Sequence, residues 1–188
     1  MTESLAGKTI ALLVANGFEE IEMTEPQKAL LGAGASVKLV SSETALVNGW
    51  HGAAWGHYFP IDGALSTQMA ADFDALLVPG GHRSIIALAK SAHTNRFLKG
   101  FLDGDKPVVL VGDAASLLVG AERAAGRSVV AEGESAEALG AAGANVDGEA
   151  TSQVDGSLLT VRAGLEGPEV TSIVMSHLGG DGSVAEAA

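Results

Sequence analysis

The segment Lys106-Pro-Val-Val-Leu-Val-Gly-Asp-Ala-Ala-Ser-Leu-Leu-Val-Gly120 decides the fold of this chain. Residues 108–112 form an apolar run of strand character that breaks at Gly112-Asp113, and residues 114–121 follow with the composition of a helix. A short run without polar residues suits a parallel strand that is covered on both faces. The Gly-Asp junction supplies the tight turn from strand to helix. In open α/β sheets, ligands bind at such turns, at the carboxyl ends of the strands.

Similar elements lie on both sides of this segment. Strands are expected at 8–15, 36–42, 72–78 and 127–131, and a hairpin at 153–161 with its turn at Asp155-Gly156. Helices are expected at 21–33 (with Pro26 in the first turn), 84–90, 94–102, 135–142 and 168–178. This alternation predicts a single α/β domain over 1–178, a doubly wound parallel sheet with helices on both faces, followed by a flexible tail at 179–188.

The composition limits the classes of function. Hydrophobic residues make up 47% of the 188 residues and aromatic ones only 4%, so Ala, Val, Leu and Ile must build the core. A formal net charge of −12 argues against binding to nucleic acid or an anionic membrane. No apolar run reaches the ~18 residues of a membrane span. Residues 1–8 lack the features of a signal peptide, so we expect a cytoplasmic protein. With no cysteine, the chain has no thiol nucleophile and no disulfide.

Half of the Phe, Trp and Tyr residues, including both tryptophans and the one tyrosine, lie in one irregular segment, 43–69. It contains Trp50, His51, Trp55, His57, Tyr58 and Phe59, after a turn at Asn48-Gly49. We favour a short hairpin or flap that packs over the sheet edge, because aromatic residues mainly supply buried area. A ligand platform is the alternative. A metal site at the two histidines is a further one, but nothing else with ligand spacing accompanies them.

A second glycine-rich turn follows the strand expected at 72–78. Pro79-Gly80-Gly81 would let the backbone approach a ligand closely and present N–H donors to it. The same glycines would also serve a plain connection from strand to helix. Gly80, Gly81 and Gly112 are therefore the candidate ligand-binding positions.

Three segments, taken in order, resemble the DJ-1/PfpI superfamily. They are Gly17-Phe18-Glu19-Glu20-Ile21-Glu22, Phe73-Asp74-Ala75-Leu76-Leu77-Val78-Pro79-Gly80-Gly81 and Lys106-Pro-Val-Val-Leu-Val-Gly. The resemblance extends from about residue 8 to residue 178, and it implies a flavodoxin-like, class I glutamine-amidotransferase-like fold and a homodimer. The last segment is also similar to the C-terminal domain of large-subunit catalases, which shares the fold, lacks the elbow cysteine and has no established catalysis.

In the family, the central strand ends in Cys-His-Gly-Pro or a close variant, and the cysteine lies on a nucleophile elbow beside a glutamate. By position, the glutamate is Glu22, while Gly112 replaces the cysteine and Asp113 the histidine. Gly80 and Gly81 match the family's backbone donors near the nucleophile. Some members carry a further acid after Pro-Gly-Gly, whereas this region reads His82-Arg83-Ser84-Ile85. The resemblance thus implies a member without the family's nucleophile.

Two functions remain open. The first is a non-catalytic protein, stress-related, chaperone-like or ligand-binding, with an unidentified small-molecule ligand and neither cofactor nor metal. Its basis is that Gly112 has no side chain that could attack a substrate. The second is a hydrolase or lyase with a rebuilt acid–base or metal site at Glu22 and Asp113, with His82 within reach. Two carboxylates in a partly buried site raise one pKa, which could yield a general acid or base.

Asp113 also has a simpler interpretation, which we favour: its carboxylate caps the following helix through free N–H groups. Ser116 lies about one turn inside that helix and is therefore unsuited to replace the nucleophile. Glu19 and Glu20 are expected to face solvent in the first turn of their own helix, where negative charge is favoured.

Overall fold

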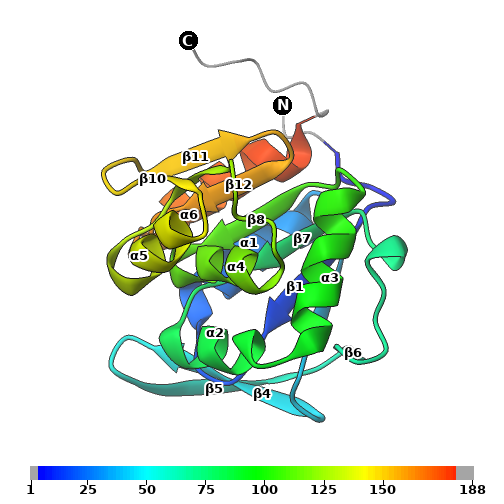
Figure 1. Ribbon diagram of the computed structural model, residues 1–188. Coiled ribbons are helices and arrows are strands. Elements are labelled where there is room, and N and C mark those ends of the chain that lie inside the picture. The colour runs from blue at the N-terminus through cyan, green and yellow to red at the C-terminus, as the bar shows by residue number, and fades with distance from the viewer. Residues whose placement is uncertain (1–3, 181–188) are drawn as a thin grey trace.

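The computed structural model describes residues 4–180, and a seven-stranded sheet forms its centre. The strands of this sheet are β1 (Thr9–Val14), β3 (Ser36–Ser41), β6 (Gly63–Ala64), β7 (Ala75–Val78), β8 (Val108–Val111), β11 (Ser152–Asp155) and β12 (Leu158–Val161). Their order is β11-β12-β8-β7-β1-β3-β6 (Figure 1). Neighbouring strands run parallel except at one edge, where β11 pairs antiparallel with β12. The segment 108–112 thus supplies a central strand.

Helices cover both faces of this sheet. They are α1 (Glu20–Gly32), α2 (His82–Ala89), α3 (Ala92–Asp103), α4 (Leu117–Gly120), α5 (Gly133–Ala141) and α6 (Gly167–Gly179), with short 3-10 turns η1 (Ala70–Asp72) and η2 (Gly112–Ser116). Apolar residues of α1 and α6 pack on one face, and those of α2 to α5 with η2 pack on the other. The arrangement confirms the predicted α/β fold.

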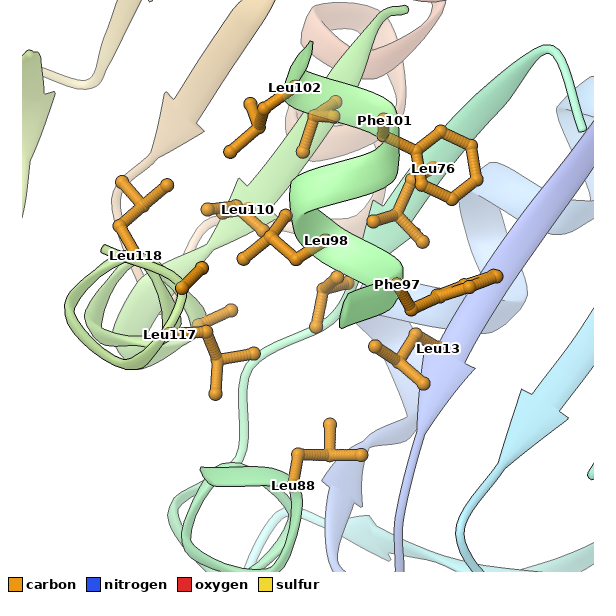
Figure 2. Close-up of a cluster of buried hydrophobic side chains, with 14 of the residues drawn as sticks. Leu13, Leu76, Leu88, Phe97, Leu98, Phe101, Leu102, Leu110, Leu117 and Leu118 are labelled. Carbon is orange, nitrogen blue, oxygen red and sulfur yellow. The ribbon is translucent and has the colours of Figure 1, made fainter. Parts of the chain in front are cut away.

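Two separate hydrophobic clusters result from the alternation of side chains along each strand. In β7, Leu76 belongs to the cluster beneath α2 to α5, whereas Leu77 belongs to the cluster beneath α1 and α6. Figure 2 shows the first of these clusters, where Phe97 and Phe101 of α3 lie against the sheet residues. Because the strands are buried on both faces, they read as continuous apolar runs in the sequence.

Two smaller sheets flank the main one. In the first, β2 (Phe18–Glu19) pairs with β4 (Leu46–His51), which forms an antiparallel hairpin with β5 (Ala54–Pro60). The hairpin is present as predicted, but its aromatic residues do not mainly supply buried area, since Trp55 and Tyr58 are 50% and 67% exposed. In the second, β9 (Ser128–Val130) pairs parallel with β10 (Asn145–Asp147). The sequence did not predict the strands β10 and β6, because neither is long enough to show a periodic pattern.

The boundaries of several predicted elements are wrong. The strand expected at 72–78 begins only at residue 75, after the η1 turn, and the helix expected at 114–121 is divided into η2 and α4. The helix α1 begins at Glu20, so Pro26 lies inside it and not in its first turn. A proline there removes one intrahelical hydrogen bond to the carbonyl four residues earlier, that of Glu22.

The predicted tail is partly incorrect, because α6 continues through Gly179. The rest of the predicted tail, residues 181–188, lies outside the described residues. Within residues 4–180, none of the helices combines the length and apolar character that crossing a bilayer would require.

We predict that Leu110→Ala destabilises the fold by roughly 2–5 kcal/mol, because it opens a cavity in a strand that is covered on both faces. Leu110 is fully buried in β8. Leu31→Ala is the matched control, since the Leu31 side chain is 53% exposed on α1. Urea unfolding of both variants tests this, and equal losses of stability would contradict the assignment of β8 to the core.

Candidate functional site

The turn after β8 keeps the shape of an elbow although it has no side chain at its apex. Gly112 has a φ of +57°, a left-handed conformation that suits glycine and strains other residues. A Cβ atom at this position would also lie 3.0 Å from the Cβ atom of Ala163. The β8–η2 turn is therefore sharp, and its apex is bare.

Glu22, in the first turn of α1, lies near the β8–η2 turn. Its side chain is buried, and its Oε2 atom accepts a hydrogen bond from the backbone N–H of Gly80 at 2.7 Å. Burial raises the pKa of Glu22 to about 7, with the nearby charges of Glu19 and Asp113 acting in the same direction and the Gly80 N–H opposing them. Near neutral pH this group is therefore able both to give and to take a proton.

Asp113 does not act as the predicted helix cap. The η2 turn begins at Gly112, so Asp113 lies inside its first turn, with Val111 at the N-cap position. Its Oδ1 atom instead accepts a hydrogen bond from the backbone N–H of Gly81 at 3.0 Å. Burial raises the pKa of Asp113, while hydrogen bonds from the N–H groups of Gly81 and of Asp113 itself, and the charge of His82, oppose that rise.

The two glycines of Pro79-Gly80-Gly81 thus give their N–H groups to two carboxylates. Such a pair of adjacent donors could otherwise stabilise a developing oxyanion. Here Glu22 takes the first donor and Asp113 the second. Ser116 takes no part in these two hydrogen bonds. Its hydroxyl donates to the backbone carbonyl of Asp113 at 2.7 Å.

A cavity of about 530 Å³ lies at this edge of the sheet, at the carboxyl ends of β7, β8 and β12. All six candidate residues from the sequence line it: Glu22, Gly80, Gly81, His82, Gly112 and Asp113. Residues that the sequence reading did not single out for this site complete the wall, among them Glu19, Glu132, Arg162, Ala163, Gly164 and Glu166. Arg162 forms an ion pair with Glu132 on the rim. Arg162 directly follows β12. Its position at the carboxyl end of a strand was the one feature of the sequence that could have indicated a place in the site.

The expectation that Glu19 and Glu20 face solvent is wrong. Glu19 lines the cavity, and burial raises its pKa, with Asp113 acting in the same direction and His51 opposing it. The Glu20 side chain is buried between the strands of the β4–β5 hairpin, where Gly56 leaves room for it; a Cβ atom there would clash with the Glu20 carboxylate.

Glu20 fastens the hairpin to the body of the protein. Its Oε1 atom accepts the backbone N–H of His57, and its Oε2 atom lies 3.1 Å from Nδ1 of His57 and 3.5 Å from Nδ1 of His51. Even so, no group of three or more His, Asp or Glu side chains within residues 4–180 has an arrangement that could hold a metal ion.

The fold and this site define a doubly wound α/β protein with an elbow turn beside a buried glutamate. The profile of the DJ-1/PfpI family matches residues 8–176, and the chain belongs to that family.

Relatives and solved structures agree with this membership. The chain is 36% identical to "Putative cysteine protease YraA" of Bacillus subtilis (strain 168) over 139 residues, covering 73% of this chain and 79% of that one. It is 34% identical to "General stress protein 18" of the same organism, covering 64% and 69%. The structure of Drosophila melanogaster DJ-1beta aligns with a TM-score of 0.79 at 23% identity, covering 93% and 91%. A two-domain protein of Anabaena variabilis, with DJ-1/ThiJ/PfpI-like and ferritin-like domains, aligns with a TM-score of 0.82 at 24% identity. That alignment covers 95% of this chain and 50% of the Anabaena chain.

We predict that Glu22→Gln stabilises the protein at about pH 8 by roughly 1–3 kcal/mol, and that this gain shrinks toward about pH 5. The folded-state pKa of Glu22, about 7, lies above the ordinary value of 4.5. The folded state therefore binds the extra proton between these values, and wild-type stability falls as pH rises through them. Glutamine keeps an oxygen that can accept the Gly80 N–H.

Urea unfolding at several pH values measures this effect. Glu25→Gln, an exposed position of the same helix, is the matched control and should change stability little at any pH. A Glu22→Gln gain that is independent of pH would contradict the burial of an ionisable group at this position.

Proposed function

We propose that this chain is a non-catalytic member of the DJ-1/PfpI family that binds a small molecule in the cavity beside Gly112. The observation that carries the proposal is the state of the elbow. The position that the family resemblance assigns to the nucleophile is a glycine, and the N–H groups of Gly80 and Gly81 are held by carboxylates of the chain itself. Acyl chemistry of the family's kind would lack both its nucleophile and its free donors.

The cavity supports the ligand-binding part of the proposal. Its volume is about 530 Å³, and carboxylates and glycines line it. It lies at the carboxyl ends of the strands, where ligands bind in folds of this class. The chain offers no cysteine that peroxide or a thiol reagent could modify. We expect the ligand to be bound and released unchanged.

We extend the proposal to a stress-related role in the cytoplasm for a homodimeric protein. The similarity to General stress protein 18 supports the role, and the resemblance to the DJ-1/PfpI superfamily supports the dimer. The net charge of −12 fits a protein that remains dispersed and avoids nucleic acid and anionic membranes.

A second candidate function, general acid–base catalysis by Glu22, is favoured by one observation. A carboxyl group with a pKa of about 7 in a cavity has the value that proton transfer at neutral pH requires. The enzyme would then be a hydrolase or lyase in which Glu22 moves the proton, its pKa raised by burial and further by the charges of Glu19 and Asp113.

We predict that the purified protein hydrolyses chromogenic peptide amides and converts methylglyoxal no faster than the same protein after heat denaturation. The physical reason is the missing nucleophile and the occupied donors. A cysteine-bearing relative assayed in parallel shows that the substrates and conditions are adequate. Turnover comparable to that of the relative would overturn the proposal.

The same assays separate the two candidate functions. Turnover that rises or falls around pH 7 and disappears in Glu22→Gln, but not in Glu25→Gln, would establish the acid–base reading instead. For the non-catalytic reading, a screen of small molecules by thermal shift should find ligands that raise the Tm of the wild type. Asp113→Asn should fold and lose that response.

A further inference from the structure

A second cavity, of about 340 Å³, adjoins the first. It is lined by Gly17, Glu19, Trp50, His82 and Arg83. Glu19 and His82 line both cavities, so the two spaces meet at these side chains. We call the two adjoining spaces together the crevice, with an inner part at the bare elbow and an outer part lined by Trp50 and Arg83.

Arg83 is held in the outer part by aromatic rings. Its guanidinium carbon lies 5.1 Å from the ring centroid of Trp50 and 5.6 Å from that of Trp55, and the two rings stand edge to face. These cation–π contacts fix the orientation of the guanidinium without neutralising its charge. The aliphatic part of the Arg83 side chain packs closely against Gly17. A Cβ atom at Gly17 would lie only 2.6 Å from the Cβ atom of Arg83.

No carboxylate within residues 4–180 forms an ion pair or hydrogen bond with Arg83. Among the other arginines of residues 4–180, Arg123, Arg127 and Arg162 each have an acidic partner, and Arg96 donates to the backbone carbonyls of Leu65 and Gln68. An oriented guanidinium whose N–H groups remain available is suited to bidentate recognition of a carboxylate.

The inner part has the opposite character. Glu19, Glu22 and Asp113 face it, and the backbone N–H groups of Gly80 and Gly81 are already used by two of these carboxylates. Arg162 also lines this cavity but is paired with Glu132, and His82 lies where the two cavities adjoin, so this end offers a ligand chiefly hydrogen-bond acceptors and negative charge. A ligand group that binds there should be a donor, and an ammonium group fits best.

We propose that the crevice binds a zwitterionic amine–carboxylate, an amino acid or a short ω-amino acid. Its ammonium group lies among Glu19, Glu22 and Asp113, and its carboxylate lies on Arg83. This inference rests on the proposed ligand-binding function and names the chemical class of the ligand. A simple amine would leave Arg83 unused, and a simple carboxylate would meet repulsion at the inner end.

Calorimetric titration with three matched series of probes tests the proposal. The series are ω-amino acids of increasing chain length, n-alkylamines and n-alkyl carboxylates. At the best length, the ω-amino acid should bind at least tenfold more tightly than the amine or the carboxylate of the same length. Arg83→Gln should remove that advantage and leave the affinity for the amine unchanged.

Two further variants make the test specific. Arg83→Lys keeps the charge but not the planar fork, so it should retain only part of the advantage. Lys90→Gln removes one positive charge from the exposed far end of the same helix and should leave all affinities as in the wild type. Thermal unfolding confirms that each variant is folded.

The outcomes separate this inference from the proposed function. If amines bind as tightly as the ω-amino acids, or Arg83→Gln leaves the advantage intact, the zwitterion assignment fails while the ligand site stands. Failure of every series to bind would also overturn the assignment. The proposed function falls on other results: turnover in the assays above, or a thermal-shift screen in which no small molecule raises the Tm of the wild type.

Discussion

Two adjacent backbone N–H groups, those of Gly80 and Gly81, hold the functional edge of this protein together. The first donates to Glu22 of α1 and the second to Asp113 of the β8–η2 turn. The carbonyl of Gly80 in turn accepts the N–H of Glu19 at 2.9 Å. One dipeptide thereby joins two segments that are far apart in the chain, the one with Glu19 and Glu22 and the one with Asp113, and all of these residues line the cavity.

This arrangement costs stability. Glu22 is buried beside the half-buried Asp113, with Glu19 nearby, and burial and like charge both raise the pKa of Glu22. A glutamine at 22 and an asparagine at 113 would each keep one acceptor oxygen, whereas each carboxylate also receives a second backbone N–H, that of Gly164 at Glu22 and that of Asp113 itself at Asp113. The carboxylates thus serve as structural acceptors. Their charge, or the proton that Glu22 can carry, is in addition a property that a ligand in the cavity could use.

Sequence reasoning succeeded where the signal was local or came from the family resemblance. The apolar run 108–112 predicted a buried strand, and the resemblance brought Glu22, Gly80 and Gly112 to one site, as the structure has them. It failed where the environment of a side chain depends on a contact between segments that are distant in the chain. Helix capping by Asp113 is a local rule, whereas its actual partner, Gly81, lies 32 residues away in the chain. The burial of Glu20 depends on space left by Gly56, which no helix pattern could reveal.

The negative charge of Asp113 is unfavourable for a thiolate at the neighbouring position 112, where this chain has glycine. A thiolate forms readily where positive charge or donors lower the pKa of the thiol, and a neighbouring histidine can supply that charge. Here an aspartate stands in the position of the histidine, its carboxylate occupies the Gly81 N–H, and two glutamates lie close by. A thiol at position 112 would face negative charge, and its pKa would rise. The carboxylates around the bare apex thus give the site an electrostatic field whose sign suits a bound cation.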